Sequence, residues 1–457
     1  MAFCSPIRYG NMHHLSLPSD HSGTKAETGK ITSEGGTMLE RPKKRYTAVT
    51  ATLFGMLALL ALAMWGCGTS GYDNPNAGIT TTQTPTALIE AATLKQWVDE
   101  GKVNNQDTAT RDKVVVLEVT TSAAYATSHI PGSLLMNSGG ELTMTRLEGV
   151  APISTMILDG NTMDTLIKKS GINGNTTVVF SVSKNGSWMN IARAYFTFRY
   201  WGFPKERLKV LNGGDNAWED AGNTLDAVAP TVAASTYSVR SNAAMQTDLR
   251  YSIGQMIKLV DDINLGTVTT AATGVSILDV RGGAPTTYVA NATVDDFAQY
   301  GDAIAGKTTR FKSIADLTTR LTAMGVTSAK SRTYVYCASG MRAAVPFFVL
   351  DGVMGWPVTM YDGSWNQWSA YTTANLPNSA TAAWRIDTNT SGTTLPRTTG
   401  SSLTGTLTLD PASSIMYTSI TDPRANQILN DDVNYFNAGT TTTTSSGGSS
   451  GGSSSGC

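Results

Sequence analysis

Cysteine and charge are scarce in this sequence. Its 457 residues include four cysteines and four histidines, and charged side chains make up 15%, against about 25% in an average soluble domain. So few cysteines exclude a disulfide framework that would staple the chain. The net charge of −1 provides no basic surface for a phosphate backbone, so we expect no nucleic-acid partner. The length is sufficient for two or three domains.

The N-terminal segment has the pattern of an export signal. A basic stretch at 41–45 precedes an apolar run at 47–65, and Gly66-Cys67 follows. This resembles a bacterial lipobox, in which Cys67 would be lipidated and residues 67–86 would form a flexible tether. The alternative is an uncleaved transmembrane anchor, because the run is long enough to span a bilayer.

Both interpretations put the body of the protein outside the cytoplasm. We expect a cell-envelope protein, periplasmic or at the outer membrane, that contacts the membrane through a lipid anchor. Residues 1–37 are polar and patternless, so we expect translation to begin at Met38. Residues 1–37 would then be untranslated or disordered, and 38–66 would be the signal peptide.

Short apolar runs alternate with helical spacing through the middle of the chain. The runs at 114–119 and 177–181 are of the kind found in strands buried on both faces. The second half repeats this order at 275–281 and 333–337, and the starts of the runs are separated by 63 residues in the first half and 58 in the second. The pattern predicts a duplicated α/β fold, each copy a parallel sheet flanked by helices.

The domain boundaries follow from this repeat and from composition. We expect a first domain at 87–225, a linker at 226–247 and a second domain at 248–375. Residues 376–440 form a C-terminal extension, in which 403–409 could be an edge strand and 415–417 could dock on the body. Residues 441–457 are a low-complexity tail, predicted to be disordered, that ends in Cys457.

Cys337 ends an apolar strand and is followed by a Gly-containing loop and then by a helix. Loop N–H groups and the positive end of a helix dipole favour a thiolate over a thiol, and Arg342 adds a positive charge nearby. The alternative is a buried structural cysteine. Cys337 is the one cysteine within a region expected to fold. In an exported protein that has no internal disulfide framework, a single cysteine at such a position favours the reactive interpretation.

Five short motifs carry a family resemblance. They are Leu278-Asp-Val-Arg281, Tyr336-Cys-Ala-Ser-Gly-Met-Arg342, Tyr361-Asp-Gly-Ser-Trp365 and, in the first half, Ser128-His-Ile-Pro-Gly132 and Asn212-Gly-Gly214. Together they resemble tandem-domain rhodaneses, thiosulfate sulfurtransferase-like proteins, over residues 88–375. The resemblance implies an inactive first copy, with Ser181 at the position of Cys337, and a catalytic second copy.

The resemblance also implies a reaction. Cys337 would take a sulfur atom from a small anionic donor such as thiosulfate, as a covalent persulfide that needs no cofactor or metal. It would pass this sulfur to a thiol or dithiol acceptor, for example on a periplasmic redox protein. The remaining site residues are implied as loop donors and anion binders, Ala338, Ser339, Gly340, Met341, Arg342 and Arg281, and as pocket walls, Tyr361 and Trp365. The alternatives are an ion pair of Arg281 with Asp279 and core packing of the two aromatic residues.

The loop length separates related reactions. Four residues stand between Cys337 and Arg342, whereas related phosphatases and arsenate reductases have five, so the shorter loop favours sulfur over phosphate. The second copy also lacks a His-Ile-Pro-Gly segment at 301–306, which indicates an altered pocket. Two alternatives therefore stay open: a persulfide carrier or sensor with little turnover, and an accessory protein for selenite or tellurite.

Overall fold

The computed structural model describes residues 86–107, 112–149, 151–370, 386–388 and 424–438. Cys67, the predicted signal peptide, the possible strand at 403–409, the docking segment at 415–417 and the tail lie outside these ranges. Within them, no helix combines the length and the apolar character that crossing a membrane requires.

The first half is built on a five-stranded parallel sheet in the order β1-β7-β6-β2-β3. Every residue of β2 and β6 is buried, as expected for a parallel sheet covered on both faces. The strands are β1 (Leu88–Ile89), β2 (Val114–Thr120), β3 (Leu134–Asn137), β6 (Thr177–Ser181) and β7 (Leu208–Leu211). The helices are α2 (Ala91–Asp99), α3 (Ser122–Thr127), α4 (Gly160–Lys169), α5 (Trp188–Tyr200), the 3₁₀ turn η1 (Lys205–Arg207) and α6 (Gly214–Asp220).

Alternate residues of β2 face two different cores. Val116 packs with Trp97 of α2 and Trp218 of α6, whereas Leu117 belongs to the cluster that contains Phe196 of α5. The period of two follows from the geometry of a strand. Helices therefore cover both faces, which confirms the predicted α/β architecture with a parallel sheet.

A hairpin is inserted between β3 and α4. Its strands β4 (Met144–Glu148) and β5 (Ala151–Met156) pair antiparallel with each other in a separate sheet. Thr155 near the end of β5 has φ +62°, a left-handed conformation that is unusual for a β-branched residue. This hairpin brings residues of the first half to the second half.

The second half has a parallel sheet in the order β8-β15-β14-β9-β11, which repeats the order of the first sheet. Its strands are β8 (Arg250–Tyr251), β9 (Val275–Asp279), β11 (Ala292–Val294), β14 (Arg332–Tyr336) and β15 (Val358–Tyr361). Its helices are α7 (Ile253–Asn264), α8 (Ile314–Ala323), α9 (Ala344–Phe348), the π-helical turn η5 (Val349–Met354) and α10 (Ser364–Ala370). Shorter elements are η2 (Val239–Ser241), η3 (Thr247–Leu249), β10 (Thr287–Val289), η4 (Phe297–Tyr300), β12 (Gly301–Asp302) and β13 (Arg310–Phe311).

Helices α5 and α9 pack against each other across the two halves. Phe196 and Phe347 meet edge to face with ring centroids 4.9 Å apart, and Tyr195 and Phe348 do the same. One hydrophobic cluster includes residues of both halves. Because α9 directly follows the Cys337 loop, the first half supports the helix on which that loop ends.

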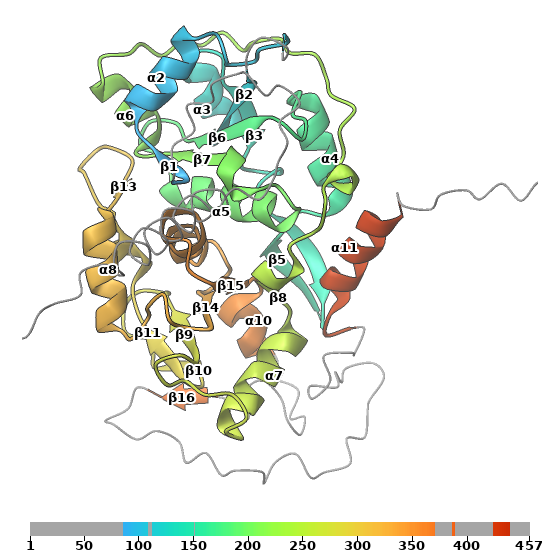
Figure 1. The fold of residues 1–457 in the computed structure, drawn as a ribbon, viewed down its shortest axis with the longest axis vertical. Coiled ribbons are helices and arrows are strands. Elements are labelled where there is room, and N and C mark those ends of the chain that lie inside the picture. The colour runs from blue at the N-terminus through green and yellow to red at the C-terminus, as the bar shows by residue number, and fades with distance from the viewer. Residues whose placement is uncertain (1–85, 108–111, 150, 371–385, 389–423, 439–457) are drawn as a thin grey trace, which may run out of the picture. The chain divides into compact units, whose positions relative to one another are not determined.

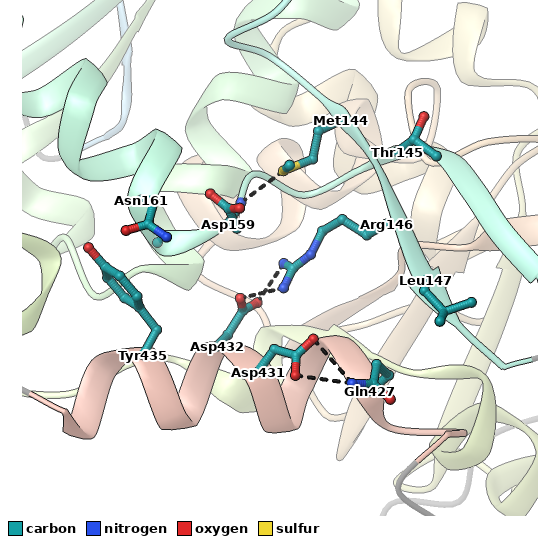
Figure 2. Close-up of a pocket in the computed structure, with 11 residues that line it drawn as sticks. Met144, Thr145, Arg146, Leu147, Asp159, Asn161, Gln427, Asp431, Asp432 and Tyr435 are labelled. Carbon is teal, nitrogen blue, oxygen red and sulfur yellow. Dashed lines mark hydrogen bonds and ion pairs between the residues drawn. The ribbon is translucent and has the colours of Figure 1, made fainter.

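Two parts of the C-terminal extension contact the body. Strand β16 (Ile386–Thr388) pairs antiparallel with β10. Helix α11 (Gln427–Asn437) packs on the β4 hairpin, where Asp432 forms an ion pair with Arg146 at 2.7 Å and accepts a hydrogen bond from Tyr200 at 2.9 Å. Figure 2 shows this side of α11 across a cavity of about 460 Å³ from β4 and the start of α4. The sequence did not predict either element.

Candidate active site

Cys337 lies at the carboxyl end of β14, directly before the loop that leads into α9. The residue is only 1% exposed, and the Gly340 N–H group donates to its Sγ at 3.2 Å. The Cys337 N–H group donates to Ser364 Oγ at 3.2 Å. The loop thus curls around the sulfur with a backbone donor facing it, an arrangement that favours an anionic sulfur.

The turn between β15 and α10 holds the base of this loop. The N–H groups of Trp365 and Asn366 donate to the carbonyl groups of Cys337 and Ala338, each at 2.9 Å. Ser364, which accepts from Cys337, has φ +54°, a conformation that costs free energy for a residue other than glycine. The motif at 361–365 therefore contributes backbone contacts to the site as well as side chains.

Gly340 occupies a position that only glycine fits. Its φ is +84°, and a Cβ atom there would lie 2.8 Å from the Asp362 carbonyl oxygen and 2.9 Å from Arg193. Both the conformation and the space exclude a side chain. Of the other loop residues, Ala338, Ser339, Met341 and Arg342 are each partly exposed.

The two predicted anion-binding arginines interact with protein groups. Arg281 is bidentate to the Asp279 carboxylate, at 2.7 and 3.0 Å, and its guanidinium lies 4.3 Å from the centre of the Trp365 ring. Arg342 donates to the Arg281 carbonyl oxygen. The predicted alternative for Arg281, an ion pair with Asp279, is therefore present in the structure.

The two predicted pocket-wall residues lie in different environments. Trp365 is half-buried beside Arg281. Tyr361 is fully buried in a hydrophobic cluster that also contains Ile257 of α7 and Ile277 of β9, and the centre of its ring lies 6.0 Å from that of Trp368. The position of Tyr361 corresponds to the core-packing alternative.

Residues of the first half that the sequence did not single out also reach the loop. Thr155 Oγ1 donates to the Ser339 carbonyl at 2.7 Å. Arg193 of α5 is completely buried, forms an ion pair with Asp362 at 2.7 Å, and donates to the Gly340 carbonyl at 3.5 Å. An arginine among Ile191, Ala192, Ala194 and Phe196 was a signal, because a charged residue is rarely buried unless it is paired.

Asp362 lies at the centre of a buried ionic network. Besides Arg193, it contacts Arg250 at 3.2 Å, and Arg250 in turn binds Glu148 of β4 at 3.0 Å. Burial acts to raise the pKa of Asp362, but the two guanidinium groups outweigh it and hold the pKa below its usual value. The carboxylate is therefore ionised at neutral pH, and it links both halves at the loop.

The first half has a valine at the position of Cys337. Glu118 pairs with Ser181 in the first sheet, and the equivalent Asp279 pairs with Tyr336 in the second. The residue after Ser181 is Val182, whose carbonyl accepts from the turn after β7 as that of Cys337 does from the turn after β15. The prediction that Ser181 takes the place of the cysteine is therefore wrong by one residue. The apolar runs looked alike, but the ladder hydrogen bonds set the register.

Buried carboxyl groups lie beside Val182. Ser181 Oγ donates to Asp215 at 3.0 Å, and Glu118 is completely buried. Burial raises the pKa of Asp215 to about 7, and burial together with the charge of Asp215 raises the pKa of Glu118. His129 of the Ser-His-Ile-Pro-Gly segment is buried, and its ring stacks on that of Tyr125 with the centroids 3.9 Å apart.

Within the described ranges, no group of three or more His, Cys, Asp or Glu side chains is arranged to hold a metal ion.

Comparison with known proteins agrees with this fold. Residues 91–221 match the family model described as Rhodanese-like domain. The sulfur carrier protein TtuD of Thermus thermophilus is 28% identical over 278 residues, which cover 56% of this chain and 88% of that protein. A thiosulfate sulfurtransferase of Corynebacterium glutamicum is 26% identical over 264 residues, 54% of this chain and 79% of that protein.

Among solved structures, the crystal structure of YnjE aligns with a TM-score of 0.47 and 20% identity, over 62% of this chain and 66% of that chain. The family model thus supports a rhodanese-like domain at residues 91–221, and the named relatives align with more than half of this chain.

Proposed function

We propose that this protein is a sulfurtransferase that moves sulfane sulfur through a persulfide on Cys337. The relatives' names, a sulfur carrier protein and a thiosulfate sulfurtransferase, support a sulfurtransferase or sulfur carrier role. The observation that carries the proposal is the contact of 3.2 Å from the Gly340 N–H group to Cys337 Sγ. A backbone donor aimed at sulfur stabilises a thiolate, which is the reactive form.

The proposed reaction has two displacements at sulfur. The Cys337 thiolate attacks the outer sulfur of thiosulfate; the new S–S bond forms as the old one breaks, and sulfite leaves with the electron pair. An acceptor thiolate then attacks the terminal sulfur of the persulfide, and the electron pair of the broken bond returns to Cys337 Sγ. Neither step requires an external oxidant or reductant.

The loop residues have distinct proposed roles. Gly340 N–H, together with the N–H groups of Ala338, Ser339 and Met341, would hold the anionic persulfide. Arg342 follows these donors directly, so its guanidinium would bind the oxyanion end of the donor. Arg281 already binds Asp279, and we assign it to orienting Trp365 and the carbonyl that receives Arg342.

We further propose that residues 248–375 form a second rhodanese-like domain. Its support is the strand order β8-β15-β14-β9-β11, the counterpart of β1-β7-β6-β2-β3. The turns also correspond: Gly214 and Ser364 both have φ +54°, and Asn185 and Gly340 both have positive φ three residues after Val182 and Cys337. The first copy lacks the nucleophile and would be catalytically inactive.

The test is thiosulfate:cyanide sulfurtransferase activity together with intact-mass measurement after incubation with thiosulfate. The wild-type protein should gain about 32 Da, the mass of one sulfur atom, and should release thiocyanate when cyanide is added. Cys337→Ser should do neither. Persulfide formation that survives in Cys337→Ser would contradict the assignment, and so would a wild-type protein that forms no persulfide with any sulfane donor.

The second candidate is a persulfide carrier with little turnover. It is favoured by one observation, the bidentate engagement of Arg281 by Asp279, which ties up one of the two cations expected to bind the donor. A wild-type protein that forms the persulfide stoichiometrically but releases little thiocyanate would favour this carrier role.

We also propose export and lipid attachment at Cys67, on the sequence pattern alone. Metabolic labelling with a fatty acid in a bacterial host should label the wild-type protein, and Cys67→Ala should abolish the label. An unlabelled wild-type protein would contradict lipidation.

A further inference from the structure

One peptide group of the Cys337 loop is held at both ends. Its N–H end, from Gly340, donates to Cys337 Sγ at 3.2 Å. Its carbonyl end, from Ser339, accepts from Thr155 Oγ1 at 2.7 Å. In a planar trans peptide the C=O and N–H groups point in opposite directions. A bond at the carbonyl end therefore fixes the direction of the N–H group.

The loop needs such an anchor because of Gly340. Glycine adopts positive and negative φ with similar ease, so a rotation of the peptide between 339 and 340 meets little resistance from the local chain. The rotated peptide would turn a carbonyl oxygen towards Cys337 in place of the N–H group. That oxygen would repel a thiolate, so the reactivity of the sulfur depends on which end of this peptide faces it.

Arg193 acts on the same structure from the neighbouring peptide. It donates to the Gly340 carbonyl at 3.5 Å and to the Thr155 carbonyl at 3.0 Å, while Asp362 holds its guanidinium at 2.7 Å. A single buried side chain thus contacts the loop, the residue that anchors the loop and the turn beneath it. Together these three contacts of Arg193 fix the position of Thr155 relative to Gly340.

Thr155 is itself in an unfavourable conformation, with φ +62°. A β-branched residue rarely adopts this region, and such strain persists where the surroundings impose it, often at functional sites. Its hydroxyl also lies 2.6 Å from the Ser154 carbonyl, so one proton is shared between two acceptors. The left-handed backbone places the hydroxyl between the hairpin and the loop.

We propose that Thr155 and Arg193 are positioning residues for the sulfur-transfer site. They hold the peptide between Ser339 and Gly340 so that its N–H group stabilises the Cys337 thiolate and the persulfide formed from it. The half of the protein without the cysteine therefore provides part of the reactive site. The persulfide part rests on the proposed function, whereas the effect on the thiolate does not.

The test compares Thr155→Val, which removes the hydroxyl but keeps the branched shape, with Thr155→Ser, which keeps the hydroxyl. Thr165→Val is the matched control, because the exposed Thr165 also loses one hydrogen bond, to Asn161. In the full chain, the rate of iodoacetamide alkylation of the Cys337 peptide is measured by mass spectrometry against pH. Thr155→Val should shift the midpoint of this profile upward by about 1 pH unit, and the other two variants should keep the wild-type midpoint.

Arg193→Lys gives an independent second measurement. It keeps the positive charge beside Asp362 but lacks the guanidinium fork that reaches two carbonyl groups, so a smaller upward shift is expected. A folded Thr155→Val protein with the wild-type midpoint would overturn the proposal. So would a Thr155→Ser protein that shares the shift. If Thr155→Val does not fold, a wild-type midpoint in Arg193→Lys overturns it.

Turnover separates this inference from the proposed function. In an active enzyme, Thr155→Val should lower kcat about fivefold and change KM little, because the lost interaction acts on the reacting sulfur. A shifted alkylation profile in a protein that forms no persulfide would retain the positioning role and remove the proposed function. If the wild-type protein forms the persulfide normally and Thr155→Val shows no shift of the alkylation midpoint, the proposed function is retained and the positioning role is removed.

Discussion

Arg193 of α5 lies 2.7 Å from Asp362 at the end of β15, and both side chains are fully buried. Asp362 also accepts from the Ile157 N–H group at 2.9 Å and contacts Arg250. The turn that follows Asp362 carries Ser364, which accepts the hydrogen bond of the Cys337 N–H group. The ionic contact between the halves is therefore also a contact that fixes the base of the reactive loop.

Asp362→Asn should strongly destabilise the protein. The change leaves Arg193 buried without a carboxylate partner and removes one of the two carboxylates that Arg250 contacts, since Glu148 remains. Breaking a buried pair in this way costs about 3–5 kcal/mol. Urea unfolding should show the loss as a lower midpoint. The control is Asp302→Asn, since Asp302 is 66% exposed and lies 3.9 Å from Lys312; such a surface pair contributes about 0–1 kcal/mol. Equal effects of the two variants would contradict the role of the buried network.

Gly340→Ala should remove reactivity through a steric clash. The added Cβ would lie 2.8 Å from the Asp362 carbonyl oxygen, so the loop must move away from the turn between β15 and α10. The control is Gly325→Ala, because Gly325 has φ +75° but a Cβ added there would have no other atom within 4 Å. Backbone strain of about 1 kcal/mol is common to both variants. We expect persulfide formation to fall at least about tenfold in Gly340→Ala alone; a similar loss in Gly325→Ala would contradict the steric explanation.

The carboxyl pair in the first half predicts a dependence of stability on pH. Burial raises the pKa of Asp215 to about 7, above its unfolded value near 3.9. Between these values the native state binds a proton that the unfolded chain has released. The stabilisation is therefore fully present below about pH 4 and is lost as pH rises through about 7.

Asp215→Asn should remove the part of this dependence that comes from Asp215, because the amide does not titrate, whereas Glu118 stays buried and keeps its own raised pKa. The free energy of unfolding of the wild-type protein, relative to the variant, should fall by about 2–4 kcal/mol between pH 4.5 and 8. Urea titrations across this range measure the difference. Asp302→Asn should keep the wild-type slope, and an unchanged slope in Asp215→Asn would mean that Asp215 is ionised in the native protein throughout.

Sequence reasoning predicted the sheets because their strands are short and continuous in apolar residues. The predicted run at 114–119 became Val114–Thr120, and that at 333–337 became Arg332–Tyr336. The error of one residue at Ser181 shows the limit of such patterns. In a strand buried on both faces, every position is apolar or small, so the pattern does not define the register.

The reactive loop could be found from the sequence because its parts are close together in the chain. The anchors of the loop could not, because Thr155 and Arg193 stand 184 and 147 positions from the loop residues that they bind. Only the packing of α5 on α9 and the hairpin geometry bring them together. Helix α11 was missed for the same reason. The surface that it packs on, the β4 hairpin, is far away in the sequence, so the sequence of the helix does not show which of its faces is buried.

Helix α11 should be an integral part of the fold, and two adjacent aspartates test this. Asp432 is 1% exposed and binds Arg146 and Tyr200 of the first half. Asp431 is exposed and contacts only Gln427 on its own helix among the bonds drawn in Figure 2. Both residues are in the same turn, so helix propensity changes equally when either becomes asparagine.

Asp432→Asn should lower the free energy of unfolding by about 3–5 kcal/mol, because it leaves the buried Arg146 guanidinium without a charge partner. Asp431→Asn should lower it by less than about 1 kcal/mol. Urea unfolding compares the two variants directly, and limited proteolysis should release the C-terminal segment faster in Asp432→Asn only. If both variants unfold like the wild-type protein, α11 rests on the β4 hairpin without stabilising it. If both are equally destabilised, the effect comes from the helix itself and the contact with Arg146 is not its cause.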